Sequence, residues 1–142
     1  MKELLIAIDF DGTCVTHEFP KIGRDIGSQK VLKAIVAAGH KLILFTMRSD
    51  IVNPVSEDKD IHLEDGNYLT DALNWFKAND IPLYGIQTNP TQHTWTTSPK
   101  AYANLYTDDA ALGCPLKMGE NGERDYVDWD AVELWLKRNR II

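Results

Sequence analysis

An uninterrupted apolar run from Leu4 to Ile8 opens the chain and stops at Asp9. A strand with one face in water would alternate apolar and polar residues, and a helix with one face in water would carry apolar residues at every third or fourth position. This run shows neither pattern. Continuous apolar runs of this length are typical of strands buried on both faces of a parallel sheet. The run therefore predicts the first strand of such a sheet, and that strand ends in an acidic residue.

Further strands and helices follow in an order typical of layered α/β domains. Strands are predicted at 41–45, 83–87 and 103–107, and helices at 28–38, 68–80 and 129–139. Ser28 is the expected cap of the first helix, and Gly39 its stop. The polar segment 47–67 is expected to be a loop with a short turn of structure. We therefore predict a single α/β, Rossmann-like domain over residues 1–142, with a mostly parallel central sheet and helices on both faces.

The composition disfavours several classes of function. The chain has 142 residues, of which 44% are hydrophobic and 25% charged, as in ordinary globular domains. Its formal net charge of -6 disfavours non-specific binding to nucleic acid or to anionic membranes. No apolar segment approaches the roughly 20 residues that span a bilayer, and the amino terminus lacks the regions of a signal peptide. We expect a cytoplasmic protein in which Cys14 and Cys114 are reduced thiols.

Polar residues follow each predicted strand at its carboxyl end. Parallel strands bring these ends to one edge of the sheet, where α/β proteins bind their ligands. The residues are Asp9 and Asp11 after the first strand, Thr46 and Arg48 after the second, Thr88 and Asn89 after the third, and Asp108 and Asp109 after the fourth. Lys100 lies in the loop before the fourth strand. We therefore expect carboxylates, hydroxyls and basic side chains from separate parts of the chain to meet at this edge.

This set of side chains suits phosphoryl transfer. Carboxylates that lie close together repel one another unless a cation lies among them, and a set with oxygen ligands alone favours Mg²⁺. One carboxylate can attack phosphorus to give an aspartyl-phosphate, while a second one moves protons to the leaving group and from water. Gly12 permits a turn that aims both carboxylates of the first pair at the site. Thr46, Lys100 and main-chain N–H groups between Asp11 and Thr13 would bind the phosphoryl oxygens.

The same residues resemble the four motifs of the haloacid dehalogenase superfamily, whose members are mostly Mg²⁺-dependent phosphohydrolases. The first motif, DxDGT, is matched by Asp9–Thr13 after an apolar strand. The other three are matched by Thr46 at the end of a strand, by Lys100, and by the acidic pair Asp108–Asp109. All four occur in family order over residues 4–109.

The resemblance implies a role for each matched residue and a phosphatase activity for the protein. Asp9 would be the nucleophile and Asp11 the general acid and base. Thr46 and Lys100 would stabilise the phosphoryl group, to which Gly12 and Thr13 would also bind. The expected ligands of Mg²⁺ are Asp9, the main-chain carbonyl of Asp11, Asp109 and Asp108, of which Asp108 could instead support the direct ligands. Arg48 could bind a second anionic group of the substrate, or form an ion pair.

The chain is too short in two places for the cap domain that many members of the superfamily carry. Between Thr13 and Lys41 there is room only for a flap at about 14–22 and one helix, and between Gln87 and Lys100 only for a loop. A capless site would admit a phosphorylated small molecule or a larger phosphorylated substrate. It could also be covered by a neighbouring subunit, so a homo-oligomer is one option.

Two other functions stay open at this point. A phosphomutase of the same superfamily would transfer the phosphoryl group between hydroxyls, but such enzymes usually need a cap. A receiver-like regulatory domain also combines aspartates with a threonine and a lysine, but its phosphoacceptor follows a middle strand of the sequence and no DGT accompanies it. The position of Asp9 after the first strand, with Asp11 beside it, favours turnover over signalling.

Overall fold

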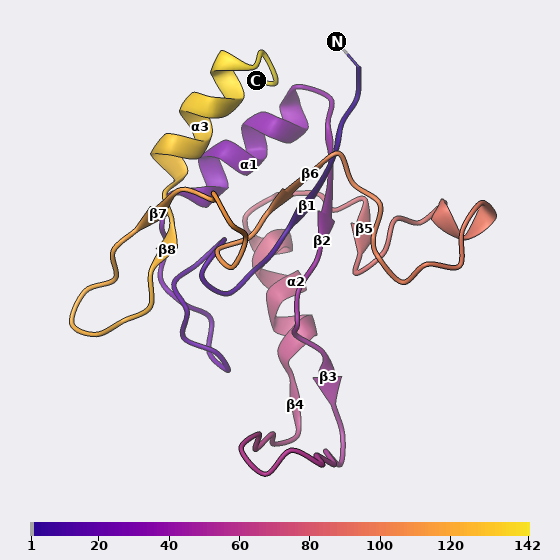
Figure 1. The fold of residues 1–142 in the computed structure, drawn as a ribbon, viewed down its shortest axis with the longest axis vertical. Helices are drawn as coiled ribbons and strands as arrows, with labels where there is room; N and C mark the ends of the chain where they lie inside the picture. Colours follow the sequence, from indigo (N-terminus) through magenta and orange to yellow (C-terminus); the bar gives the residue numbers. More distant parts are fainter. Residues whose placement is uncertain (1) are drawn as a thin grey trace.

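A four-stranded sheet lies at the centre of the protein (Figure 1). The computed structural model describes residues 2–142. The strands are β1 (Leu5–Ile8), β2 (Lys41–Leu44), β5 (Gly85–Ile86) and β6 (Leu105–Thr107). They lie in the order β5-β2-β1-β6, and each of them runs parallel to its neighbours. The predicted α/β fold with a parallel sheet is confirmed, and β1 is an interior strand.

The register of the strands brings their carboxyl ends to one level. Ile8, the last residue of β1, pairs with Leu44 of β2 and with Thr107 of β6. The residues that follow β1 and β6 are Asp9 and Asp108, and the Asp9 N–H still donates to the Thr107 carbonyl at 3.0 Å. Acidic residues from two distant parts of the sequence therefore lie side by side at the carboxyl edge of the sheet.

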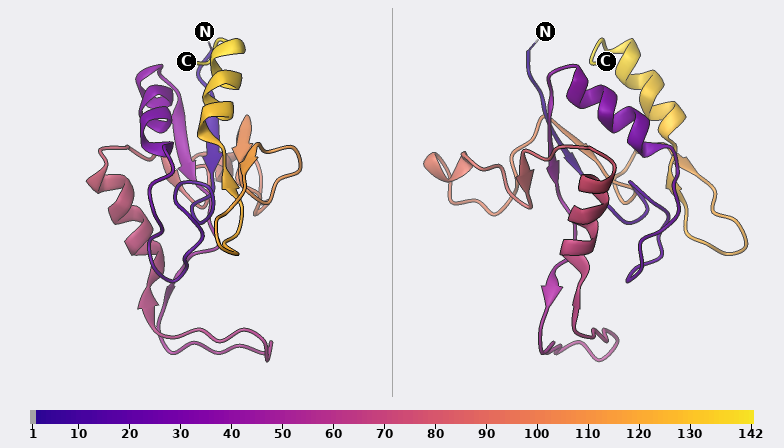
Figure 2. Two further views of the ribbon diagram at one scale, coloured as in Figure 1. Left: turned by 90° about the vertical axis from the view of Figure 1, so that its left-hand side faces the viewer. Right: turned by 180° about the vertical axis from the view of Figure 1, so that it is seen from behind.

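All three helices cover the same face of the sheet, so the prediction of helices on both faces is wrong. They are α1 (Ser28–Ala37), α2 (Tyr68–Ala78) and α3 (Trp129–Arg138). The strand residues that pack with all three helices in one apolar cluster include Ile6, Ile8, Leu42 and Leu44. These residues share one face because side chains alternate along a strand. In the view from behind in Figure 2, the helices lie in front of the strands.

The opposite face of the sheet is only partly covered. Ala7 and Ile43 are buried on this face, whereas Tyr106 keeps 40% of its surface exposed. Part of the segment 87–104 covers it, and the Tyr106 hydroxyl donates to the Ala101 carbonyl in this segment at 2.6 Å. Strands that are apolar on both faces are thus buried here by helices on one side and by irregular chain on the other.

The helices lie close to their predicted positions, but α1 begins differently from the prediction. Gly27, with a φ of +86°, precedes the helix, and Ser28 does not cap it. The Ser28 hydroxyl instead donates to the Cys14 carbonyl at 2.6 Å, which ties α1 to the loop after β1. Asp128 caps α3 by accepting two N–H groups of its first turn. Within residues 2–142 no helix combines the length and the apolar character needed to cross a membrane.

Two short antiparallel pairs of strands lie outside the central sheet (Figure 1). β3 (Asp50–Ile51) pairs with β4 (Gly66–Asn67) at the base of a long arm, within the segment predicted as a loop. β7 (Leu116–Lys117) pairs with β8 (Tyr126–Val127) in a hairpin between β6 and α3. A 3-10 helix, η1 (Gln92–Thr94), lies in the segment between β5 and β6. These additions leave the order of the four central strands unchanged.

Candidate functional site

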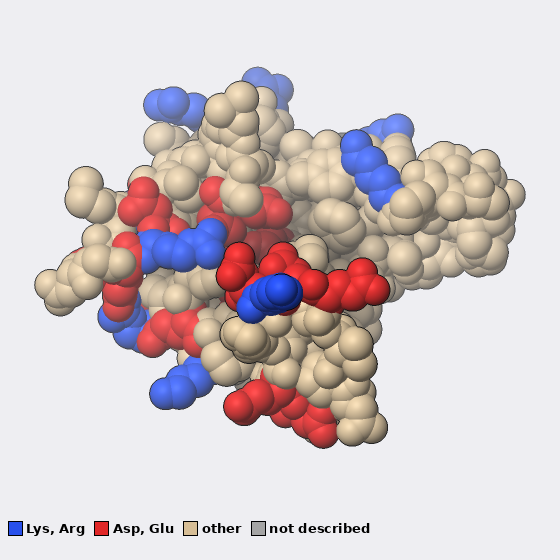
Figure 3. All heavy atoms as spheres, turned by 60° about the horizontal axis from the view of Figure 1, so that its bottom comes forward, with Lys and Arg blue, Asp and Glu red and all other residues tan. Residues whose placement is uncertain are grey.

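Three carboxylates gather at the carboxyl edge of the sheet. Asp9 follows β1, while Asp108 and Asp109 follow β6. Each of the three offers one oxygen within 4.8 Å of those of the other two, and all three residues are partly buried. Figure 3 looks from the side to which this edge points, where acidic side chains gather with basic ones among them. A cluster of carboxylate oxygens of this size could hold a hard cation such as Mg²⁺.

Thr13 links two of these carboxylates and is itself fully buried. Its Oγ1 lies 3.0 Å from Asp9 Oδ2 and 3.1 Å from Asp109 Oδ1, and it accepts the Asp109 N–H at 3.1 Å. Gly12 has a φ of +80°, and a Cβ there would lie 2.6 Å from Asp109 Oδ2. The N–H groups of Gly12 and Thr13 donate to carbonyls of the same loop. In this structure the two residues therefore shape the cluster, and their amides are already engaged.

The carboxyl group of Asp9 is held in its protonated form by its surroundings. Burial, a hydrogen bond with Asp109 and the charge of Asp108 together raise the pKa of Asp9 from 3.8 to about 8. The hydrogen bond from the Thr13 hydroxyl acts in the opposite direction and is weaker. Near neutral pH Asp9 therefore keeps a proton, unless a cation among the three carboxylates displaces it.

Asp11 lies outside this cluster, and its carboxylate is bound by Arg48. The Arg48 Nε donates to Asp11 Oδ2 and its Nη2 donates to Asp11 Oδ1, both at 2.8 Å. Only 1% of the Arg48 side chain and 12% of the Asp11 side chain are exposed. Of the two roles left open for Arg48 by the sequence, this structure has the ion pair. The ligand position expected for Asp11 is its main-chain carbonyl, which this ion pair does not involve.

Arg48 also joins two other parts of the chain, the flap and the start of α2. Its Nη2 donates to the Lys21 carbonyl at 2.8 Å and its Nη1 to the Tyr68 carbonyl at 3.1 Å. The rings of Phe10 and Phe19 each lie 5.1 Å from its Cζ, within the range of a cation–π interaction. The buried guanidinium therefore connects Asp11 to the flap and to the start of α2.

Thr46 lies directly after β2 and is held by the side chain of Gln87, a residue that no sequence motif indicates. The Gln87 side chain accepts the Thr46 N–H at 2.9 Å and donates to the Thr46 carbonyl at 2.6 Å. Gln87 itself has a φ of +65° and follows β5. The Thr46 hydroxyl accepts the Arg48 N–H at 3.1 Å. Gln87 thus joins the ends of two strands, and no local pattern distinguishes it from an ordinary loop glutamine.

The other expected members of the site are placed elsewhere in this structure. Lys100 is exposed, and its Nζ lies 5.5 Å from the centre of the Tyr106 ring, on the face of the sheet that lacks helices. Within residues 2–142 it makes no ion pair within 4.0 Å of a carboxylate. Asn89 is buried in the loop, where its side chain donates to the Tyr102 carbonyl at 3.4 Å. Thr88 lies beside it in the same loop. Neither of these two loop residues belongs to the carboxylate cluster.

A basic residue outside the predicted site, Arg124, lies next to the cluster. Arg124, near the tip of the β7–β8 hairpin, has its Nη2 4.0 Å from Asp109 Oδ2. A local signal for this hairpin was present, because Asn121-Gly122 is a dipeptide typical of tight hairpin turns. Both residues indeed have positive φ, of 52° and 80°. The proximity of Arg124 to Asp109 could not be inferred, since it depends on how the hairpin packs.

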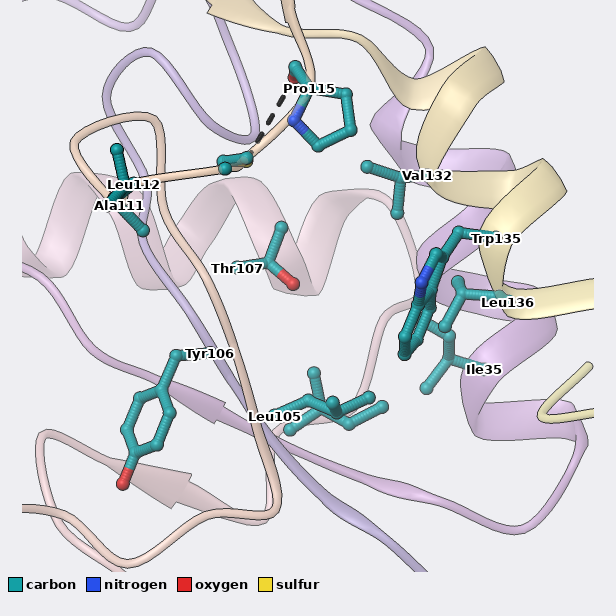
Figure 4. A pocket seen from close by; sticks show the side chains of 13 residues that line it. Ile35, Leu105, Tyr106, Thr107, Ala111, Leu112, Pro115, Val132, Trp135 and Leu136 are labelled. Atoms are coloured by element: carbon teal, nitrogen blue, oxygen red, sulfur yellow. Dashed lines mark hydrogen bonds between the residues drawn. The ribbon is translucent and has the colours of Figure 1, made fainter. Parts of the chain in front are cut away.

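An apolar cavity of about 280 Å³ lies beside β6, apart from the carboxylates. Figure 4 shows Trp135 and Val132 of α3 on one side of it and Leu105 of β6 on another, while the Tyr106 ring points away. Its lining contains no carboxylate and no basic side chain. The cavity therefore offers space for apolar groups and no groups for phosphoryl chemistry.

Comparison with known proteins supports the fold over nearly the whole chain. No family model matches the sequence, and no curated protein matches it. A solved structure of a conserved protein from Bacteroides thetaiotaomicron is similar to it, with a TM-score of 0.70 and 27% sequence identity. The match covers 97% of this chain and 93% of the other. The arrangement described above therefore has a counterpart among solved structures that extends across the domain and is not limited to the central sheet.

Proposed function

We propose that the protein is a Mg²⁺-dependent phosphomonoester hydrolase that works through an aspartyl-phosphate on Asp9. The observation that carries this proposal is the convergence of Asp9, Asp108 and Asp109 within 4.8 Å at the carboxyl edge of a parallel sheet. Asp11 follows Asp9 by two residues, as in the DxDGT motif of the haloacid dehalogenase superfamily. The proposal also places the protein in that superfamily, as a member without a cap domain.

The donor set of the cluster fits Mg²⁺. Carboxylate oxygens and the Thr13 hydroxyl converge there, and hard oxygen ligands are what this ion prefers. Asp9, Asp108 and Asp109 would hold it, together with the main-chain carbonyl of Asp11. When bound, Mg²⁺ would neutralise charge on the cluster and on the phosphoryl oxygens. The raised pKa of Asp9 supports this assignment. Without a cation in the cluster Asp9 keeps a proton near neutral pH, and it has to lose this proton before it can act as the nucleophile.

The residues of the chain then divide the chemistry between them. An ionised Asp9 attacks phosphorus and the bond from phosphorus to the leaving oxygen breaks, while an Asp11 that enters this step protonated gives that oxygen its proton and becomes the carboxylate that Arg48 binds. In the second half of the reaction Asp11 takes a proton from water, which attacks the aspartyl-phosphate and releases inorganic phosphate. Arg48 occupies two of the roughly four lone-pair positions of the Asp11 carboxylate, so the others remain for substrate and water. Arg48 therefore fixes the orientation of Asp11.

A single substitution tests the role of Asp9. Asp9→Asn removes the nucleophile while keeping its size, and we expect it to lower hydrolysis of p-nitrophenyl phosphate in excess Mg²⁺ by several orders of magnitude. The matched control is Asp58→Asn, which removes an exposed acid of the arm and should hydrolyse at the wild-type rate. Full turnover by Asp9→Asn would refute the proposal. A panel of phosphorylated metabolites, sugars, nucleotides and phosphopeptides then identifies the substrate class.

The products separate this function from the two alternatives. A hydrolase releases inorganic phosphate, whereas a phosphomutase yields an isomeric phosphate ester and no free phosphate. A receiver-like switch instead retains the phosphoryl group on Asp9 for minutes or longer. Quench-flow labelling with a ³²P-labelled acyl phosphate separates the hydrolase from the switch, and rapid loss of label as inorganic phosphate is the result expected here. Analysis of the products from a phosphate monoester separates the hydrolase from the mutase.

A further inference from the structure

Arg124 is the basic residue that lies nearest to the carboxylate cluster. Its Nη2 is 4.0 Å from Asp109 Oδ2, and no other ion pair within residues 2–142 reaches Asp9, Asp108 or Asp109. We propose that Arg124 binds the phosphoryl oxygens of a phosphate monoester, the position that the sequence assigned to Lys100. This inference rests on the proposed function, because it names a substrate-binding residue of the same site.

The hairpin that carries Arg124 is fixed to the loop that carries the nucleophile. The Val127 N–H donates to the Gly12 carbonyl at 3.0 Å, and the Trp129 indole N–H donates to the Thr13 carbonyl at 2.7 Å. Trp129 is buried, as is Val127. Arg124 lies only three residues before Val127, so these two anchors hold its main chain beside the loop after β1. The main chain that carries Arg124 is therefore held by the fold and does not depend on the hairpin tip alone.

The guanidinium of Arg124 is available to an anion. Its Nη1 donates to His17 Nε2 of the flap at 2.9 Å, and an accepting histidine nitrogen brings no negative charge. The distance of 4.0 Å to Asp109 exceeds that of a hydrogen bond, and 64% of the Arg124 side chain is exposed. A cation bound by Asp109 would weaken this contact further. Arg124 could then present its planar pair of N–H donors to phosphate oxygens, which such a fork fits well.

Other basic residues near the site do not offer the same donors. Arg48 is buried and bound to Asp11, and Lys100 lies over the Tyr106 ring. Arg24, in the chain just after the flap, pairs with Glu123 of the hairpin at 2.7 Å. Arg24 and Arg124 therefore both connect the flap region to the hairpin tip, but only Arg124 lies near a carboxylate of the cluster. This difference makes Arg24 the matched control.

The test compares Arg124→Gln and Arg124→Lys with Arg24→Gln. Binding of inorganic phosphate to the Mg²⁺-loaded protein is measured by isothermal titration calorimetry, and p-nitrophenyl phosphate turnover is measured in parallel. We expect Arg124→Gln to weaken phosphate binding and to lower kcat/KM by about tenfold or more, with Arg124→Lys in between. Arg24→Gln should stay within about twofold of wild type in both. The midpoints of thermal unfolding should agree among all variants, since both arginines are exposed.

Each outcome decides between the inference and the function on which it rests. If Arg124→Gln binds phosphate and turns over substrate like Arg24→Gln, Arg124 is not a substrate ligand, and hydrolysis by all variants would leave the proposed function intact. If phosphate binding depends on Arg124 but the wild type hydrolyses no phosphomonoester, the result supports the anion site at Arg124 and refutes the proposed function. A wild type that neither binds phosphate nor hydrolyses esters would overturn both.

Discussion

Two hydrogen bonds of 2.8 Å join the Arg48 guanidinium to the carboxylate of Asp11, beneath the surface of the protein. A buried arginine is costly to desolvate, and here that cost is offset by a bidentate carboxylate and by main-chain carbonyls of Pro20, Lys21 and Tyr68. The pair thus connects the acid and base of the proposed reaction with the flap on one side and α2 on the other. Disturbing Arg48 should affect stability and catalysis together.

Arg48→Met keeps much of the side-chain volume but leaves Asp11 without its partner. Breaking a buried ion pair by removing one member costs about 3–5 kcal/mol, so we expect a loss of unfolding free energy of that size in urea titrations. Arg24→Met removes an exposed ion pair with Glu123 and should cost far less. Equal losses in the two variants would contradict a structural role for the Arg48–Asp11 pair.

The raised pKa of Asp9 makes the stability of the metal-free protein depend on pH. Folded Asp9 titrates near pH 8 and unfolded Asp9 near 3.8, so between these values the folded protein holds a proton that the unfolded chain has lost. Raising the pH through this window therefore lowers the unfolding free energy. Urea titrations in EDTA from about pH 5 to about pH 8 measure this fall. Asp9→Asn should show a shallower pH dependence, and an unchanged slope in that variant would exclude Asp9 as its source.

Magnesium binding should be coupled to proton release from the same group. A cation displaces the proton of Asp9, so the affinity for Mg²⁺ should rise as the pH approaches about 8. Calorimetry at neutral pH in two buffers of different ionisation enthalpy reveals the released proton. The matched variants are Asp109→Asn, which should bind Mg²⁺ weakly, and Asp58→Asn, which should bind like wild type. Equal affinities in these two variants would show that the ion binds elsewhere.

The positions of the central strands and of the three gathered aspartates followed from the sequence for a simple physical reason. Parallel strands end at one edge, which brings the residues after β1 and β6 to the same side of the sheet, and they meet because β1 and β6 are neighbours in it. The coverage of the sheet could not be predicted in the same way. Continuous apolar strands show that both faces are buried, but not whether helices or irregular chain bury them.

Side chains that reach the site from loops were harder to predict than those at strand ends. The order of residues in the sequence predicts a place for Lys100 at the site, but its position depends on the path of the whole segment 87–104. The sequence allows two roles for Arg48, because its partner depends on the rotamer of Asp11 and on the flap. The sequence does not predict the position of Arg124, because the anchors of its hairpin, Val127 and Trp129, contact residues more than a hundred positions earlier.

Two glycines allow a direct test of how closely Asp109 depends on the loop after β1. Gly12 and Gly27 both have positive φ, of 80° and 86°, so alanine at either position should cost about 1 kcal/mol from backbone strain. A Cβ at Gly27 meets nothing within 4 Å, whereas a Cβ at Gly12 would lie 2.6 Å from Asp109 Oδ2. Gly12→Ala should therefore displace Asp109 and weaken Mg²⁺ binding and hydrolysis, while Gly27→Ala should lower only the unfolding free energy. Calorimetric titration with Mg²⁺ and urea unfolding of both variants separate these effects. Wild-type Mg²⁺ affinity in Gly12→Ala would show that the close approach of Gly12 to Asp109 is not needed for the ion.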